Sequence, residues 1–163
     1  MIELQTSLRH MAWADDKFFA AVSGLTEDRL AYTNGDPDWP IARGLVHILQ
    51  GVQWYRFLLL GAQWSELKTP TNTAEVADLR RRLAELNSSL IEAANEPDAV
   101  IEFEDEGGPR KALRSVVLAQ APYHAAEHRS QMVAALHANG ERSIHLDDYD
   151  VWAWFYETQS AQG

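Results

Sequence analysis

The sequence predicts an all-α protein: a bundle of four long helices, with a short β-hairpin before the fourth helix and a short aromatic helix near the C-terminal end. Two observations favour this class. Apolar residues recur at spacings of three and four in four long segments, which is the pattern of one buried helix face. Strand-like alternation is confined to a stretch after residue 100. The 163 residues, 46% of them hydrophobic, can form one sizeable core, so we expect a single domain over residues 1–163.

The first helix is expected from Leu4 to Val22, with Gly24 ending it. After a turn-rich loop, Trp39 and Pro40 introduce a second helix, with Pro40 in its first turn. The main apolar stripe of this helix consists of Ile41, Leu45, Ile48, Val52, Tyr55 and Leu59. A second stripe, about 100° round the helix, contains His47, Gly51, Trp54 and Leu58. Because this helix is apolar over a wide arc, we expect it to be central in the bundle and His47 to be buried.

The third helix is expected to begin at Asn72 or Thr73 and to stop at Pro97. Asn87 starts a glycosylation sequon, which we expect on the surface of this helix. Residues 100–103 and 110–113 can pair as a hairpin, because the segment between them is rich in turn formers.

The fourth helix is expected from about Leu113 to Ala138, and Pro122 should either kink it or divide it into two shorter helices. The last helix is expected within residues 147–156, with three aspartates in its first turn. Its aromatic residues should cover the open end of the bundle or form a subunit interface; they are Trp152, Trp154 and Phe155.

Charge and composition narrow the function classes. Fourteen basic against 24 acidic residues give a net charge of -10, which disfavours binding to nucleic acid. There are no cysteines, so a metal would be held by nitrogen or oxygen ligands. The sequence starts without a secretion signal, and no apolar run approaches the roughly 20 residues that span a bilayer. We therefore expect a cytoplasmic protein without membrane or nucleic-acid partners.

Three histidines are candidate ligands of a divalent metal ion. His124 and His128 are one helical turn apart and point to the same side as the core residues of their helix. If this helix packs beside the second one, His47 joins them, and at least one coordination position stays open, as in catalytic zinc sites. Nitrogen ligands suit zinc or nickel, among other metals. Taken alone, His47 could also be a hydrogen-bonded core residue.

Two further residues of the fourth helix are candidates for a catalytic role. Glu127 could flank the site, and a surface salt bridge with Arg129 or another basic residue is the alternative. Gln131 lies one turn beyond His128 and could hold an imidazole, a water or a substrate group, or cap buried backbone. The His-Glu-x-x-His motif of zinc proteases is excluded, because alanine follows the first histidine of the pair.

The chain resembles the DinB/YfiT-like family of metal-dependent enzymes. The resemblance rests on the surroundings of His47, on Met11-Ala-Trp-Ala-Asp15, on His124-Ala-Ala-Glu-His-Arg-Ser-Gln131 and on Asp148-Tyr-Asp-Val-Trp152. It implies a four-helix bundle with up-down-down-up connectivity, a metal site at His47, His124 and His128, and a homodimer. The family commonly has glycine at the position of Ser130, which we expect to point away from the histidines. Relatives include transferases that use thiols such as bacillithiol, mycothiol or glutathione, and a maleylpyruvate isomerase.

Three functions are compatible with these features. In a metal-dependent S-transferase, the cation binds a low-molecular-weight thiol, lowers its pKa and presents the thiolate to a small-molecule substrate. A metal-dependent hydrolase would use metal-bound hydroxide, with Glu127 or another carboxylate as the base. A non-catalytic metal-binding dimeric stress protein would use its six tryptophans for packing and for the interface.

Overall fold

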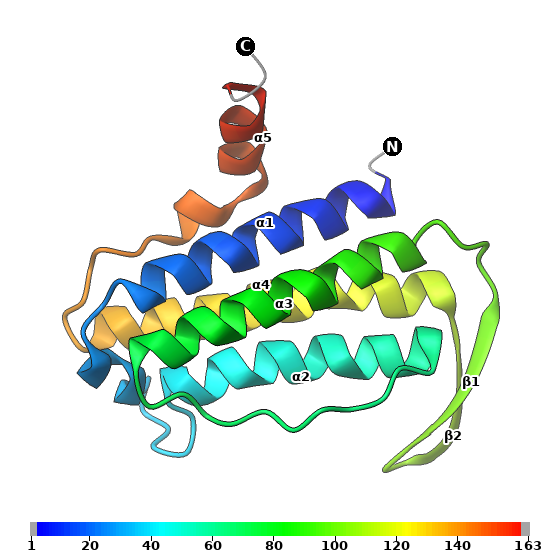
Figure 1. Ribbon diagram of the computed structural model, residues 1–163, viewed down its shortest axis with the longest axis horizontal. Helices are drawn as coiled ribbons and strands as arrows, with labels where there is room; N and C mark the ends of the chain where they lie inside the picture. The colour runs from blue at the N-terminus through cyan, green and yellow to red at the C-terminus, as the bar shows by residue number, and fades with distance from the viewer. Residues whose placement is uncertain (1–2, 161–163) are drawn as a thin grey trace.

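The computed structural model describes residues 3–160, and this part of the chain is mostly helical. Its elements are α1 (Leu4–Ser23), η1 (Glu27–Ala31), α2 (Ile41–Leu60), α3 (Thr73–Ala93), β1 (Val100–Asp105), β2 (Gly108–Leu113), α4 (Arg114–Ala138), η2 (Leu146–Tyr149) and α5 (Val151–Ser160), where η marks a 3₁₀ helix. The predicted helical class and the hairpin before the fourth long helix are confirmed (Figure 1).

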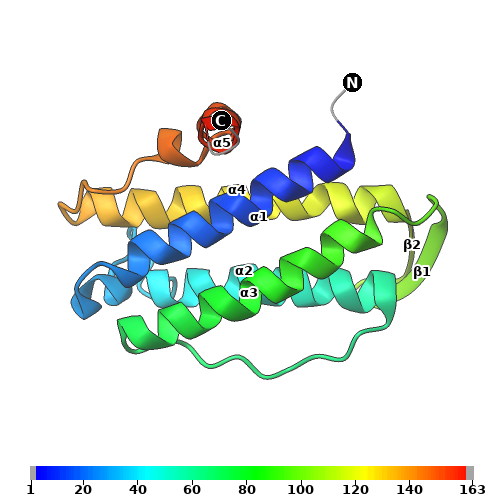
Figure 2. The same cartoon turned by 45° about the horizontal axis from the view of Figure 1, so that its top comes forward.

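The four long helices lie side by side, and each packs against two others: α1 and α2 both contact α3 and α4. In Figures 1 and 2, α1 and α4 run in one direction, and α2 and α3 run in the opposite direction. The core between them contains fully buried side chains from every long helix, such as Phe18, Leu45, Leu83 and Leu136. Burying one such side chain contributes about 1.5–3 kcal/mol to folding. The arrangement therefore leaves α2 and α4 adjacent along their length.

Local signals set most of the helix ends. Gly61 follows α2 in the left-handed conformation, with φ of 62°, which glycine adopts without a steric penalty. Asn72 caps α3 by accepting a hydrogen bond from the Glu75 backbone N–H at 2.9 Å. Pro40 is the residue before α2 rather than part of its first turn. The prediction that Pro97 stops the third helix is wrong, because α3 already ends at Ala93.

The fourth long helix is continuous through Pro122, so the alternative of two shorter helices is wrong. Proline removes one backbone N–H and displaces one carbonyl. Buried residues on both sides of it, Leu118 and Ala125, anchor α4 in the core, so packing holds the helix together across this position.

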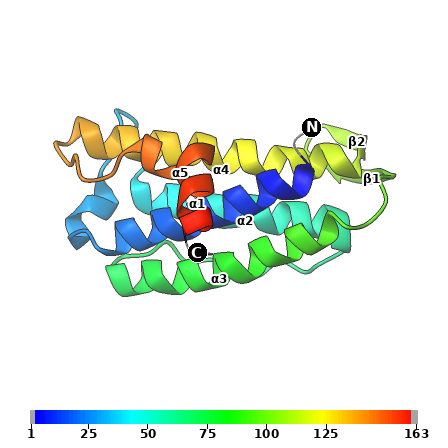
Figure 3. The ribbon, with the colours of Figure 1, turned by 90° about the horizontal axis from the view of Figure 1, so that it is seen from above.

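The C-terminal segment differs from its prediction. Asp147 and Asp148 lie in η2, and Asp150 lies just before α5, so none of the three is in the first turn of α5. Asp150 accepts a hydrogen bond from the Ala153 N–H at 2.7 Å. Helix α5 stands away from the bundle beside α1 (Figures 1 and 3). Trp152 is 68% exposed and Phe155 is 48% exposed, so the prediction that the aromatic residues cover the open end of the bundle is wrong. Their alternative role at a subunit interface stays a prediction.

A search of residues 3–160 finds no helix with the length and hydropathy needed to cross a bilayer.

Candidate metal centre

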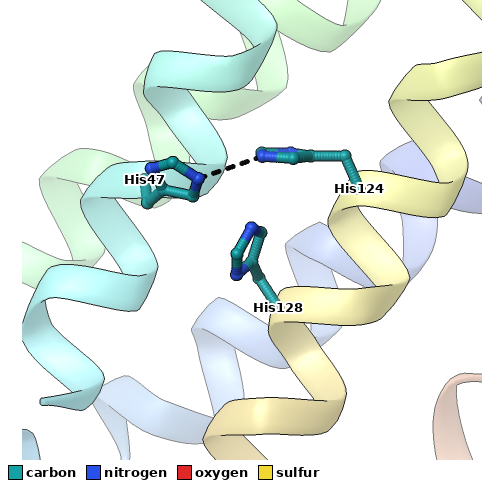
Figure 4. Close-up of side chains that lie close together, drawn as sticks. All are labelled: His47, His124 and His128. Atoms are coloured by element: carbon teal, nitrogen blue, oxygen red, sulfur yellow. Dashed lines mark hydrogen bonds between the residues drawn. The ribbon is translucent and has the colours of Figure 1, made fainter. Parts of the chain in front are cut away.

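His47 of α2 and His124 and His128 of α4 meet between the two helices (Figure 4). One ring nitrogen from each lies within 4.8 Å of the others. Nε2 of His124 and Nε2 of His47 are 3.2 Å apart. His128 is buried, whereas His47 and His124 are half-buried, so the prediction of a buried His47 is only partly met. The structure thus brings together the three histidines that the sequence singled out.

Two glycines allow α2 to approach α4 closely at this point. A Cβ atom on Gly51 would lie 2.4 Å from Cε1 of His124 and 2.7 Å from its Nδ1. A Cβ atom on Gly44 would lie 2.9 Å from Sδ of Met132. All three distances are shorter than normal van der Waals contact. A methionine side chain can move aside more easily than an enclosed imidazole. Gly51 therefore provides the space that the His124 ring occupies.

Glutamine side chains orient two of the three rings. Nδ1 of His128 donates a hydrogen bond to Oε1 of Gln131 at 2.8 Å, which leaves Nε2 of the neutral ring unprotonated. Gln50 likewise hydrogen-bonds His47. Of the alternatives predicted for Gln131, the structure shows the one in which it holds an imidazole. Gln50 was missed, although each glutamine follows its histidine by three residues, and that shared spacing was a usable signal.

The surroundings favour the uncharged form of His47 and His124. Burial lowers the pKa of His124 to about 4, and the neighbouring His128 and His47 add to this effect. Burial is also the largest cause of the lowered pKa of His47. Neutral imidazole is the form that binds a metal ion. Nδ1 of His124 is buried without a hydrogen-bond partner, which costs about 1–3 kcal/mol.

The cluster fits a divalent cation. Zinc binds imidazole nitrogen at about 2.0–2.1 Å, and tetrahedral geometry then separates two ligand nitrogens by roughly 3.3 Å. The 3.2 Å between Nε2 of His47 and Nε2 of His124 agrees with that separation. The three-histidine cluster is therefore compatible with metal binding.

Comparison with known protein families establishes the family of this chain. The sequence matches the DinB family over residues 1–160. The chain belongs to the DinB family. No curated protein and no solved structure matches it. Family membership confirms the resemblance drawn from the sequence motifs. Ser130, where the DinB family commonly has glycine, is exposed, and its hydroxyl donates to the Ala126 carbonyl at 2.9 Å.

Within the part of the chain that the structure describes, Glu127 does not form the salt bridge that was one of its two predicted roles. Its side chain is exposed and makes no hydrogen bond or ion pair with residues 3–160. The predicted salt bridge with Arg129 is wrong, because Arg129 turns into the core and pairs with Asp15. The negative charge of Glu127 favours a higher pKa for His47, but this effect is the smallest of those that act on the ring.

A cavity of about 340 Å³ adjoins the cluster in this DinB-family chain. His128 and Gln131 line it from α4, and Trp39 lines it from the loop before α2. The Trp39 ring centroid is 5.1 Å from that of His47 and 5.9 Å from that of His128. Sequence reasoning treated Trp39 only as the lead-in to a helix, because its contacts are with residues of other segments. The cavity is large enough for a small molecule beside the histidines.

Proposed function

We propose that this DinB-family protein is a metal-dependent enzyme whose divalent ion, zinc or nickel, is held by His47, His124 and His128. The observation that carries the proposal is the convergence of three imidazoles beside a small-molecule-sized cavity. Three neutral ligands leave a coordination position for a substrate atom. The chain has no cysteine, so a reacting thiol would come from a low-molecular-weight cosubstrate. We infer that the activity is thiol-dependent S-transfer to a small electrophile.

The protein's own residues supply binding and orientation in this scheme. A bound divalent cation would lower the pKa of the thiol and favour its thiolate. Gln131 and Gln50 keep His128 and His47 in fixed orientations. In the reaction the S–H proton passes to Glu127 or to water. The sulfur electron pair forms the new S–C bond, and the leaving group departs with the electrons of its bond to carbon.

Glu127 also supports a second candidate, a metal-dependent hydrolase. Its exposed carboxylate has no partner among residues 3–160 and could act as a general base toward water. A metal-binding stress protein without catalysis is the third possibility, and the same experiment distinguishes all three.

The experiment starts with elemental analysis of protein purified without added metal, with His47→Ala as the comparison. About one divalent ion per chain in the parent and much less in the variant is expected. Metal-loaded protein is then mixed with several thiols and a chlorodinitrobenzene electrophile. Thiol loss faster than in His124→Ala supports the S-transferase. Ester turnover without thiol favours the hydrolase, and metal binding without either reaction leaves the binding protein.

We further propose that residues 1–163 form a single DinB-like domain with up-down-down-up connectivity, and that it acts in the cytoplasm as a homodimer. The helix directions in Figure 1 support the connectivity. The exposed aromatic residues of α5 support an interface. Sedimentation of the parent and of Trp152→Ser tests the dimer, which the substitution should weaken.

A further inference from the structure

The cavity beside His128 has an uneven distribution of polar groups. Ile41, Met132 and Ala135 give it an apolar part, while Asn34, Asp36 and Gln131 contribute polar groups. Its volume of about 340 Å³ is at the lower end of the range for small-molecule sites. A ligand that reaches the histidines from this cavity is therefore small, and its polar end faces the loop that carries Asn34 and Asp36.

The charge in this cavity is acidic. Asp36 is the one carboxylate in its lining, and the lining contains no lysine or arginine. Oδ1 of Asp36 accepts a hydrogen bond from the Asp38 N–H at 2.9 Å, and the Trp39 N–H donates to the Asp36 carbonyl at 3.1 Å. These bonds form a local turn that orients the Asp36 side chain. They leave Oδ2 available to a ligand.

Arg43, which packs on a residue of the cavity lining, already has partners. The guanidinium of Arg43 lies over the Trp39 ring, 4.6 Å from its centroid, and Nη1 donates to the Asp38 carbonyl at 2.6 Å. Arg43 does not line the cavity. An anionic group in the cavity would thus face Asp36 without a neighbouring cation, whereas an ammonium group would find a carboxylate.

We propose that the preferred thiol is an aminothiol, with its ammonium group bound by Asp36 and its sulfur directed to the three histidines. This inference rests on the proposed thiol-dependent function. It assigns Asp36 a role in specificity that the sequence did not suggest, because Asp36 was only one of several turn-forming residues in its loop. Trp39 lines the cavity together with Asp36 and packs against His47 and His128, so one side chain connects the two ends of the proposed site.

The test uses cobalt(II)-loaded protein and three thiols of similar size: cysteamine, mercaptoethanol and mercaptoacetate, which carry positive, neutral and negative groups. Binding is followed by the sulfur-to-cobalt charge-transfer absorption. We expect cysteamine to bind about five- to tenfold more tightly than mercaptoethanol, as for one partly solvated ion pair, and mercaptoacetate to bind most weakly. Because the thiols also differ in acidity, the decisive comparison is between variants.

Asp36→Asn should abolish the preference for cysteamine while leaving the affinity for mercaptoethanol unchanged. Asp38→Asn is the matched control, since it removes the same charge from the same loop but from a residue outside the cavity lining, and the preference should persist. Equal losses in both variants would overturn the proposal. Tighter binding of mercaptoacetate that disappears in Arg43→Gln would also overturn it and assign recognition to Arg43. If no thiol produces the absorption, the S-transferase function itself fails, whereas equal binding of all three thiols refutes only the aminothiol preference.

Discussion

His128 and Arg129 are consecutive residues of α4, yet they belong to two polar clusters of opposite character. Arg129 faces α1 and pairs with Asp15, which also accepts a hydrogen bond from Asn87 at 3.0 Å. His128 faces α2, where His47 and His124 direct ring nitrogens toward the same point. Asp15, Arg129 and His128 are 0%, 3% and 8% exposed, so burial does not distinguish the two neighbouring residues of α4.

The difference lies in how each cluster satisfies its polar groups. In the Asp15 cluster the opposite charges are each other's partners, although burial raises the pKa of Asp15 against the opposing effect of Arg129. In the histidine cluster three like imidazole rings face one another. Each cluster also has one buried atom without a hydrogen-bond partner among residues 3–160, Oδ1 of Asn87 in the first and Nδ1 of His124 in the second. A buried polar group with its own counter-ion can be explained by the fold. Three ring nitrogens that converge on one point form a ligand set that a cation can complete.

The largest expected effect is on stability and comes from a change to the ion pair of Arg129 and Asp15. Arg129→Met leaves Asp15 buried without its counter-ion, so the free energy of unfolding should fall by about 3–5 kcal/mol. Urea denaturation of the metal-free protein measures this. The double variant Arg129→Met/Asp15→Leu should recover most of the loss, since an apolar pair replaces the ionic one. A single-variant loss below about 1 kcal/mol, as for a surface ion pair, would contradict the structural role of the pair.

The next largest effect should be confined to metal binding by the histidine cluster. Gly51→Ala places a methyl group where the His124 ring lies, so one ligand is displaced and the metal affinity should fall more than about 100-fold. The stability of the metal-free protein should change by no more than about 2 kcal/mol. Calorimetric titration with zinc, compared with Gly44→Ala, measures this. Equal affinity losses in the two variants would point to the spacing of the helices instead of to His124.

A smaller effect is expected from the residue that orients His128. Gln131→Ala removes the acceptor of the Nδ1 proton but keeps all three ligands, so the metal affinity should fall about 10–100-fold. Gln131→Glu, which retains an acceptor, should bind at least as well as the parent. If the alanine variant binds metal normally, Gln131 would be left with a role toward substrate only.

The smallest expected effect is the pH dependence of the metal-free protein. Since the pKa of His124 is lowered to about 4 from the ordinary value of 6.5, the unfolded chain takes up protons before the folded one does. Stability should therefore decrease as the pH falls from about 6.5 to about 4, by about 1 kcal/mol for these half-buried rings. Urea unfolding of the parent and of His47→Gln/His124→Gln across this range isolates the contribution. Identical pH profiles would show that the rings do not titrate differently on folding.

Much of the fold and the ligand set could be predicted, because the signals are local. The alternation at residues 100–103 correctly indicated the hairpin, in which Val100 pairs with Leu113. The spacing of His124 and His128 correctly indicated one helix face. Asn87 was wrongly placed on the surface: it is 1% exposed and lies at helical spacings from Leu83 and Leu90 on the buried face of α3. That periodicity can be read from the sequence, and it predicts the buried position.

The sequence by itself determined where most of the long helices begin and end and which residues share a helix face, because capping, glycine conformations and the 3.6-residue period involve residues only a few positions apart. Only the tertiary structure decided that Arg129 turns away from Glu127 to reach Asp15, that Gly51 makes room for the His124 ring, and that Trp39 and Asp36 border the cavity beside His128. Those relations join segments far apart in the chain, and they follow from how closely and in what rotation the helices pack, which no local spacing encodes.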